Sequence, residues 1–461
     1  MADAAGTGTL VRGRYVLGTA EEFAGGDILE HGAVRVLDGR IAAVGAFADL
    51  RAAHPDDAVR GSEYDLVAPG FVNAHGHFSE GLLKGLAEET NLFEWFVALI
   101  GPVAPHLDED KAHLGTLLSG MQMLLTGITT TNDMFVYDPP SGGPPATLGV
   151  VRALDELGLR GVVSYGSGDS RPTVEPGRVM EEHQALLEAA RASRLSRFRV
   201  GVAAIGVLSD DLRPRVIDFA REGGHGVHVH LQEVREEVTA IRSLRGVSPI
   251  LFAAREGLLD VPTLAAHCVW LDDDDRETLL AHGVAVAHNP VANMILASGV
   301  CPVPQLRAAG ITVGIGVDGP ASNDRQDYLE AMKTAVLLQR VHHLRARAML
   351  ARDAFRMATI EGARALGMQD EVGSLEVGKA ADIVVFDGNS PALANVHDPH
   401  QALVYVAGPR DVVDVWVDGE RSVEGGRITR VDVDDVVGRS RSHAVELARR
   451  AGLGAISRLA R

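Results

Sequence analysis

The chain has 461 residues, of which 46% are hydrophobic, so it is long enough to bury a large core and to hold more than one structural unit. Its 44 basic and 62 acidic residues give a net charge of −18, which argues against nucleic acid and anionic membranes as partners and leaves small neutral or cationic ligands open. It has only two cysteines, no apolar run long enough to span a bilayer, and no secretory pattern in residues 1–8, so we expect a cytoplasmic protein.

The first part of the chain, residues 9–67, consists of short apolar segments separated by turn residues. Asp38-Gly39 lies between two such segments, 32–36 and 41–45. This dipeptide between apolar segments is typical of a hairpin. We therefore predict a small all-β unit at this end of the chain.

In the middle of the chain, apolar strands alternate with amphipathic helical stretches such as residues 180–192. This alternation indicates a parallel sheet with helical crossovers, and eight strands over about 300 residues favour closure into a barrel rather than an open doubly wound sheet. The eight expected strands are residues 71–77, 127–131, 161–165, 198–202, 226–230, 264–267, 284–288 and 312–318.

From Gly373 onward the chain returns to short strands, with Asp418-Gly419 as a turn. Because the two ends resemble each other more than either resembles the middle, we predict an α/β fold in which a TIM-like (β/α)₈ barrel interrupts a small β-sandwich formed by both chain ends. The expected limits are 1–68 and 373–435 for the sandwich, 69–372 for the barrel, and 436–461 for a C-terminal helix packed on the outside.

The ends of the predicted barrel strands carry side chains that can bind metal. In barrels of this kind the active site lies at the C-terminal ends of the strands. His75 and His77 share one face at the end of the first strand, although by themselves two polar residues at a strand end are an equally good explanation. Five of the eight strands end in such a side chain, which scattered histidines do not explain: His75 and His77, His230 with Glu233, His267, His288, and Asp318.

Several imidazoles with one carboxylate suit zinc or a similar divalent metal and leave room for water, whose pKa the metal lowers so that hydroxide forms near neutral pH. The third imidazole is open between His228 and His230. We favour His230 because Glu233 follows just beyond the strand, and interpret His228 as a buried supporting histidine. Strand four has no acidic residue, and no lysine lies between Lys111 and Lys333, so we expect one ion rather than two bridged by a modified lysine.

Seven stretches together resemble one known family, and they span the chain from about residue 10 to 435. The chain resembles the amidohydrolase superfamily, in the branch that contains cytosine deaminase, adenosylhomocysteine deaminase and triazine hydrolase. The stretches are Pro69-Gly70-Phe71-Val72-Asn73-Ala74-His75-Gly76-His77, Gly85-Leu86-Ala87-Glu88 followed by Trp95, His230-Leu231-Gln232-Glu233, Ala265-Ala266-His267-Cys268-Val269, His288-Asn289-Pro290 with Asn293, Gly316-Val317-Asp318-Gly319 with Ser322-Asn323, and Gly373 to Asp382.

This resemblance implies one zinc ion, with iron as the alternative, bound by His75, His77, His230 and Asp318. It also implies catalytic roles: Asp318 takes the proton of the bound water, His267 orients the hydroxide, and Glu233 protonates the ring nitrogen beside the carbon under attack, as a poor heterocyclic electrophile requires. The expected substrate contacts are Glu233, His288, Trp95 and Asn293, although core packing explains Trp95 equally well.

The predicted activity is that of a mononuclear aminohydrolase, or deaminase, which attacks an amidine-like C–N bond of a small amino-heterocycle and releases ammonia. Purines, pyrimidines, pterins and triazines all qualify. Members that deaminate nucleosides have a glutamate where this chain has Ala104 and a histidine where it has residues 203–206, and both contact the ribose region. Two lost polar contacts weaken binding by about 1 kcal/mol each, which favours a free heterocycle.

Three alternatives remain: hydrolysis of a C–Cl or cyclic amide bond, as in triazine chlorohydrolases; deamination of a nucleoside or of adenosylhomocysteine; and a catalytically silent relative. Retention of Glu233 and His267 favours the aminohydrolase, because departure of an amine needs proton delivery whereas departure of chloride does not. We also expect a homo-oligomer, either a dimer or a tetramer. The exact substrate and the native metal are left open.

Overall fold

The computed structural model describes residues 6–19, 26–86, 88–139, 143–171 and 174–460. Ala87 of the family-like stretch and the first five residues of the 1–8 segment lie outside this part. Within the described residues, no helix combines the length and the apolar character needed to cross a membrane.

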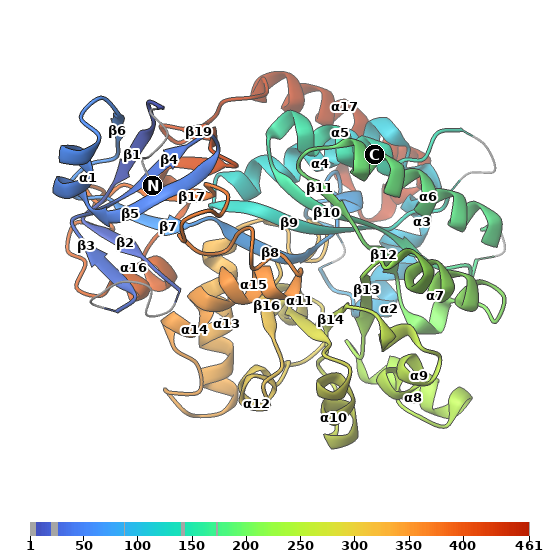
Figure 1. Cartoon of the computed structure of the whole chain (residues 1–461). Helices are drawn as coiled ribbons and strands as arrows, with labels where there is room; N and C mark the ends of the chain where they lie inside the picture. The colour runs from blue at the N-terminus through green and yellow to red at the C-terminus, as the bar shows by residue number, and fades with distance from the viewer. Residues whose placement is uncertain (1–5, 20–25, 87, 140–142, 172–173, 461) are drawn as a thin grey trace.

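Eight parallel strands form the centre of the molecule (Figure 1). Each is hydrogen-bonded to its neighbours in chain order, and β11 (Ser196–Phe198) pairs with β10 beside β12. The strands are β8 (Phe71–Gly76), β9 (Ile128–Phe135), β10 (Arg160–Ser167), β12 (Val200–Val202), β13 (Val227–Leu231), β14 (Thr263–His267), β15 (Ala285–His288) and β16 (Val313–Ile315). These match the eight strands predicted from the sequence.

The first and last strands meet, so the sheet closes on itself. Gly76 and Asp318 form a parallel bridge, and the Asp318 N–H donates to the His75 carbonyl at 3.0 Å. The Asn73 side chain adds a contact, because its Oδ1 accepts from the Val317 N–H at 2.9 Å. The predicted (β/α)₈ barrel is therefore confirmed.

Helices surround the barrel, and one of them covers the end at which the strands begin. Ala363 of α15 (Ile360–Ala365) joins an apolar cluster with Val72, Ala74 and Leu264 of the barrel strands. The opposite end of the barrel, where the strands finish, is therefore the end at which we look for a site. The other helices of this part are α4 (Glu109–Leu124), α5 (Thr147–Leu157), α6 (Pro176–Ala192), α7 (Leu212–Gly223), α8 (Arg235–Arg245), α9 (Pro249–Arg255), α10 (Asp273–Ala281), α11 (Pro290–Ile295), α12 (Val303–Ala308), α13 (Tyr328–His342) and α14 (Ala351–Met357).

A short helical segment follows β8 on the open side of the barrel. It consists of α2 (Leu92–Trp95), a π-helical turn over Phe96–Ile100, and α3 (Gly101–Val103). Asn91 begins it as an N-cap, since its side chain accepts from the N–H groups of Phe93 and Glu94. The cap fixes the point at which the chain turns back over the strand ends.

Two further sheets lie together beside the barrel (Figure 1). One is made of N-terminal strands, and the other combines strands from both chain ends. C-terminal strand β17 pairs with N-terminal strand β7 in antiparallel register, with Ile383 opposite Pro69. In spatial order, one sheet contains β5 (Arg40–Ala46), β4 (Gly32–Leu37), β1 (Thr9–Arg12) and β6 (Ala58–Arg60); the other contains β20 (Arg427–Ile428), β19 (Glu420–Glu424), β18 (Val412–Val417), β17 (Ile383–Phe386), β7 (Leu66–Pro69), β2 (Tyr15–Leu17) and β3 (Ile28–Glu30).

The two sheets share one apolar core, which makes them a sandwich. Val11 and Val34 from one sheet pack in the same cluster as Val67, Ile383 and Trp416 from the other. The β-sandwich formed by both chain ends is therefore confirmed.

The two predicted turns have the backbone that a two-residue hairpin needs. Asp38 and Gly39 have φ values of 49° and 77°, and Asp418 and Gly419 have φ values of 51° and 80°. Positive φ at both central positions matches the twist of the flanking strands, and glycine adopts it without a steric penalty.

The remaining helices are α1 (Phe47–Ala53), α16 (Pro399–Tyr405) and α17 (Val433–Arg450). Helix α17 packs on α4, on the outside of the barrel (Figure 1). It begins at Val433 and ends at Arg450, after which only short turns follow. The domain limits 1–68 with 373–435, 69–372 and 436–461 stay a prediction.

Candidate active site

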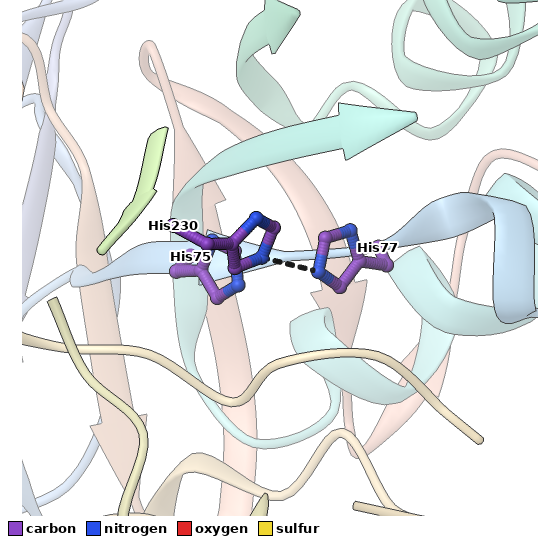
Figure 2. A group of neighbouring side chains, drawn as sticks. All are labelled: His75, His77 and His230. Atoms are coloured by element: carbon purple, nitrogen blue, oxygen red, sulfur yellow. Dashed lines mark hydrogen bonds between the residues drawn. The ribbon is translucent and has the colours of Figure 1, made fainter. Parts of the chain in front are cut away.

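Three imidazoles meet at the open end of the barrel. His75 and His77 come from the end of β8, and His230 comes from β13 on the other side of the barrel (Figure 2). The centroid of the His75 ring lies 4.7 Å from that of the His77 ring and 4.9 Å from that of the His230 ring. The side chains converge because residues 75 and 77 share one strand face and because parallel strands end at the same rim.

The hydrogen bonds of His77 and His230 fix which ring nitrogen carries the proton. His77 Nδ1 lies 2.6 Å from the Met134 carbonyl oxygen, and His230 Nδ1 lies 2.6 Å from the Ala203 carbonyl oxygen. A carbonyl oxygen only accepts, so each Nδ1 must be the donor. The two Nε2 atoms therefore carry lone pairs, and these face each other at 3.2 Å (Figure 2).

His75 has the same orientation through a different support. His228 Nδ1 lies 3.2 Å from Asn132 Nδ2 and 3.3 Å from the Ser164 hydroxyl, which donates to the Asp133 carbonyl at 2.7 Å. His228 Nε2 lies 2.8 Å from Nδ1 of His75 and forms a hydrogen bond with it. Nε2 of His75 is buried and has no hydrogen-bond partner among the described residues. His228 thus lies behind His75, as a supporting histidine.

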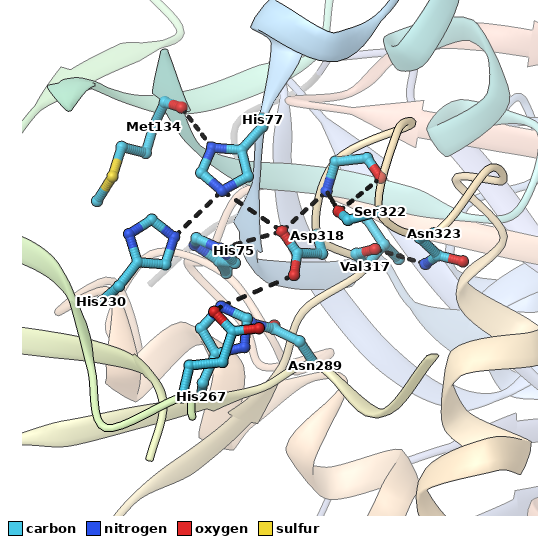
Figure 3. Close-up of polar contacts among 12 residues, drawn as sticks. His75, His77, Met134, His230, His267, Asn289, Val317, Asp318, Ser322 and Asn323 are labelled. Carbon is cyan, nitrogen blue, oxygen red and sulfur yellow. Dashed lines mark hydrogen bonds and ion pairs between the residues drawn. The ribbon is translucent and has the colours of Figure 1, made fainter. Parts of the chain in front are cut away.

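Asp318 supplies a carboxylate to this cluster. Its Oδ1 lies 3.4 Å from Nε2 of both His75 and His77 (Figure 3). Burial by itself raises the pKa of Asp318, but the surrounding imidazoles outweigh burial and hold the pKa below its usual range. The carboxyl group is therefore ionised.

A divalent cation fits this arrangement of donors. Burial lowers the pKa of His75 to about 4 and that of His77 and His230 below the usual value, so all three rings are neutral. Three imidazole nitrogens and one carboxylate oxygen then face one another. His75, His77 and His230 have nitrogen atoms within 4.8 Å of one another, and so do the ligand atoms of His75, His267 and Asp318. This donor set suits zinc.

His267 and Glu233 lie on the other side of Asp318. His267 Nδ1 donates to Asn293 Oδ1 at 2.8 Å, so Nε2 faces the carboxylates and lies 3.4 Å from Glu233 Oε2. Nε2 also lies 3.8 Å from Asp318 Oδ2 (Figure 3). Burial lowers the pKa of His267, but the Glu233 and Asp318 carboxylates outweigh burial and raise it. The Ser298 hydroxyl donates to Glu233 Oε1 at 2.8 Å.

Glu233 is fully buried, and burial raises the pKa of its carboxyl group above the usual value. A carboxyl group whose pKa is raised takes up a proton more readily, which suits a general acid. The arrangement therefore combines an ionised carboxylate at Asp318 with a second carboxyl group that favours its protonated form.

The backbone around these side chains is strained. Gln232, His267, Cys268 and Asp318 all have positive φ, at 55°, 73°, 47° and 61° respectively. Residues with a Cβ adopt this conformation at a cost and keep it only where the surroundings enforce it, most often at functional sites. Strain at three separate strand ends accords with a site assembled there.

A cavity of about 300 Å³ opens above the cluster. One wall is polar and contains His77, His230, Glu233, His267 and Asp318. The opposite wall is apolar and comes mainly from the helical segment after β8, with Leu92, Phe93, Trp95, Phe96 and Ile100. Small-molecule sites combine such a wall with a few polar groups.

The predicted substrate contacts lie in different places. Trp95 and Glu233 line the cavity, and Trp95 Nε1 donates to the Ala321 carbonyl at 3.1 Å. Asn293 is not part of the lining and bonds to His267, and its contact with substrate stays a prediction. His288 is also outside the lining; it is fully buried at the end of β15, and neither of its ring nitrogens has a partner in the described part of the chain.

Three acidic residues of the cavity wall, Glu80, Asp138 and Glu237, were not singled out from the sequence. Glu80 is buried three residues after His77, its Oε2 accepts from the Ala321 N–H at 2.9 Å, and burial raises the pKa of its carboxyl group well above the usual value. Glu237 contacts the backbone of Glu233. The signal for Glu237 was present in the sequence, because it follows Glu233 by one helical turn.

Comparison with known proteins gives one family for most of the chain. Residues 66–421 match the amidohydrolase family, and residues 32–56 match an imidazolonepropionase-like composite domain of bacteria. A 5′-deoxyadenosine deaminase of Methanopyrus kandleri is 34% identical over 418 residues, which cover 89% of this chain and 93% of that protein.

A 5-methylthioadenosine/S-adenosylhomocysteine deaminase of Desulforudis audaxviator is 37% identical over 429 residues, which cover 93% of this chain and 96% of that protein. Among solved structures, a zinc-bound adenosine deaminase from Xanthomonas campestris superposes with a TM-score of 0.89 at 29% identity, and the match covers 96% of this chain and 98% of that chain. The fold, the donor set at the strand ends and these matches agree: the chain belongs to the amidohydrolase family.

Proposed function

We propose that this protein is a metal-dependent deaminase that hydrolyses the exocyclic C–N bond of a 6-aminopurine ring and releases ammonia. The observation that carries the proposal is the convergence of three imidazoles and the Asp318 carboxylate beside the buried Glu233 carboxyl group, whose pKa burial raises. We further propose that one ion is bound per subunit by His75, His77, His230 and Asp318. The lack of any lysine between Lys111 and Lys333 supports one ion rather than two.

A divalent ion in this position supplies Lewis acidity, which makes water a nucleophile at neutral pH. The side chains of the protein move the protons. Asp318 turns Oδ2 towards His267 Nε2, so these two groups are placed to take the proton of the attacking water and to pass it to the departing amine. Glu233 protonates the neighbouring ring nitrogen, which makes the carbon more electrophilic.

The cavity supports a purine that carries a further substituent. Its polar wall contains the reacting groups, and its apolar wall, with Phe93, Trp95 and Phe96, can contact the ring and an apolar extension. Relatives at 34% and 37% identity are named as deaminases of 5′-deoxyadenosine and of 5-methylthioadenosine and S-adenosylhomocysteine. We propose an adenosine-type substrate of this kind, although Ala104 and the alanines at 203 and 204 offer the sugar no polar side chain.

The test is an ammonia-release assay on zinc-loaded enzyme with adenine, adenosine, 5′-deoxyadenosine and 5′-methylthioadenosine, and with guanine, cytosine, a pterin and an aminotriazine for comparison. The His267→Ala variant serves as the blank. We expect activity on the adenine-containing compounds and preference for those with an apolar 5′ group. If no compound releases ammonia while zinc is bound in stoichiometric amount, the deaminase proposal is wrong.

We also propose that the protein is a cytoplasmic homo-oligomer, either a dimer or a tetramer. The proposal is supported by apolar side chains on the surface of α11, of α13 and of the turn after α13: Met294, Leu337, Val341 and Leu344 are 55%, 46%, 67% and 91% exposed. Such a patch is more often covered by protein than left in water. Light scattering of the purified protein would give a single-chain mass if the proposal is wrong.

A further inference from the structure

Glu237 contacts the residue that we propose as the acid, and no role follows for it from the reaction itself. It lies in the first turn of α8, four residues after Glu233, and it lines the cavity. Its Oε2 accepts the backbone N–H of Glu233 at 3.1 Å. Its Oε1 is buried without a hydrogen-bond partner among the described residues.

This contact is not an ordinary helix cap. In a capping box the third helical residue bonds back to the N–H of the N-cap residue. Here the N-cap is Val234, with no side-chain cap, and Glu237 reaches one residue further, to Glu233. The bond therefore fixes the loop before the helix rather than the helix end alone.

The loop that it fixes is strained. Gln232 has a φ of 55°, and its side chain is tied down separately, since Nε2 donates to Asp275 Oδ2 at 2.9 Å and Oε1 accepts from the Ile250 N–H at 3.2 Å. Within the described part of the chain, the Glu233 backbone has no comparable second contact. Its N–H donates to Glu237, and Ser298 bonds to the side-chain carboxyl group of Glu233 rather than to its backbone. A strained conformation persists only when its surroundings enforce it.

The environment of the Glu237 carboxyl group is also energetically unfavourable. Burial raises its pKa to about 7, against backbone hydrogen bonds from Gln232 and Glu233 that lower it, and the neighbouring Glu233 raises it further. A partly buried acid beside a second acid, with one oxygen unpaired, costs free energy. What this costly arrangement provides is the hydrogen bond from the Glu233 N–H to the Glu237 carboxyl group.

We propose that Glu237 is a positioning residue, which holds the Gln232–Glu233 backbone so that the Glu233 carboxyl group faces His267 and the substrate ring. This inference rests on the proposed function of Glu233. The acceptor oxygen is what matters, so glutamine can replace glutamate, whereas a side chain of similar size without an acceptor cannot.

The experiment compares E237Q, E237M and the control E236A, whose side chain is exposed on the same turn. Ammonia release from 5′-deoxyadenosine gives kcat and KM, and hydrogen–deuterium exchange reports on the peptide that contains residues 232–234. We expect E237M to lose about 10- to 100-fold in kcat, because small misplacements of a catalytic group have effects of this size. KM should change by less than about 3-fold, since the cavity wall is retained.

We expect faster exchange at 232–234 in E237M, and E237Q should restore both kcat and protection to near the wild-type values. Unchanged exchange in E237M overturns the inference, and so does faster exchange with an unchanged kcat, because that result is the signature of a purely structural cap. E237Q that is as impaired as E237M also overturns it. Inactive wild-type enzyme instead overturns the proposed function, while the exchange measurement still reports whether Glu237 holds the loop.

Discussion

At the scale of single residues, the orientation of each imidazole depends on what its second nitrogen contacts. His77 and His230 donate to backbone carbonyls, whereas His75 relies on another side chain, His228. Removal of such a supporting group generally weakens metal binding without removing a ligand. His75 is therefore the ligand candidate whose orientation a side-chain substitution can change.

We expect His228→Ala to weaken zinc binding by about 10- to 100-fold, because His75 loses the hydrogen-bond partner of its Nδ1 and is no longer held in one orientation. Competition with a zinc chelator measures the change. His225→Ala is the matched control, since His225 lies in the turn before the same strand and does not contact His75. Equal zinc affinity in His228→Ala and the wild type would contradict the supporting role of His228.

A second residue-scale prediction concerns the proton on Glu233. Glu233→Gln keeps the size of the side chain but cannot transfer a proton, so kcat should fall by about 10²- to 10⁴-fold. Zinc content should be unchanged, because Glu233 is not among the residues proposed to hold the ion. Metal analysis and steady-state kinetics on the same sample test both statements, and a kcat close to that of the wild type would exclude Glu233 as the acid.

At the scale of elements, helix α6 carries a histidine that the reaction does not use. His183 is fully buried among the rings of Tyr165, Phe198 and Phe219, and neither ring nitrogen has a partner within the described ranges. Burial lowers its pKa to about 3, from an ordinary value of 6.5. In the folded protein this ring is neutral over the whole physiological range.

Because the pKa of His183 differs between the folded and the unfolded chain, the free energy of unfolding depends on pH. Between pH 6.5 and about pH 3 the unfolded chain binds a proton at His183 and the folded chain does not, so the free energy of unfolding falls as the pH falls through this window and is unaffected above it. From pH 7 to pH 5 the loss due to His183 should be about 2 kcal/mol.

His183→Phe should remove that part of the loss, and the exposed His397→Phe should not. Urea unfolding of both variants at pH 5 and pH 7 measures the difference. The same pH dependence in His183→Phe and the wild type would show that the folded protein accepts a proton at this position.

At the scale of the whole molecule, a buried ion pair joins the barrel to the terminal β-sandwich. Arg160 at the start of β10 contacts Asp382 at 3.1 Å and Asp418 at 3.5 Å, and Arg160 and Asp382 are both nearly inaccessible to solvent. Asp382 Oδ1 also accepts the Asp418 N–H at 2.8 Å. The pair therefore connects barrel strand β10 to both β17 and the turn after β18.

Arg160→Leu should lower the free energy of unfolding by about 3–5 kcal/mol, because it leaves the Asp382 carboxylate buried without its partner. Arg194→Ala is the control: Arg194 pairs with Asp418 at an exposed position, where an ion pair contributes about 0–1 kcal/mol. Denaturant unfolding measures both changes. If the two substitutions have the same effect, the junction does not depend on the buried pair.

The sequence predicted the architecture well because the evidence for it is local. Strand and helix periodicity and the Asp-Gly turns depend on neighbouring residues only. The pattern of short strands at each chain end is local in the same sense. The positions of His75, His77, His230, His267 and Asp318 at the open rim follow from the same reasoning, since parallel strands must end on one side. In these respects the chain by itself determined the fold and the composition of the site.

Only the tertiary structure decided which side chains face one another. His228 and His230 share a strand face, yet one lies behind His75 and the other beside His77, because their depth in the barrel differs. Asn293 bonds to His267, and Glu237 contacts the backbone of Glu233. Such contacts join residues far apart in sequence or across a turn, so they depend on how strands and helices are placed in space, which no local pattern records.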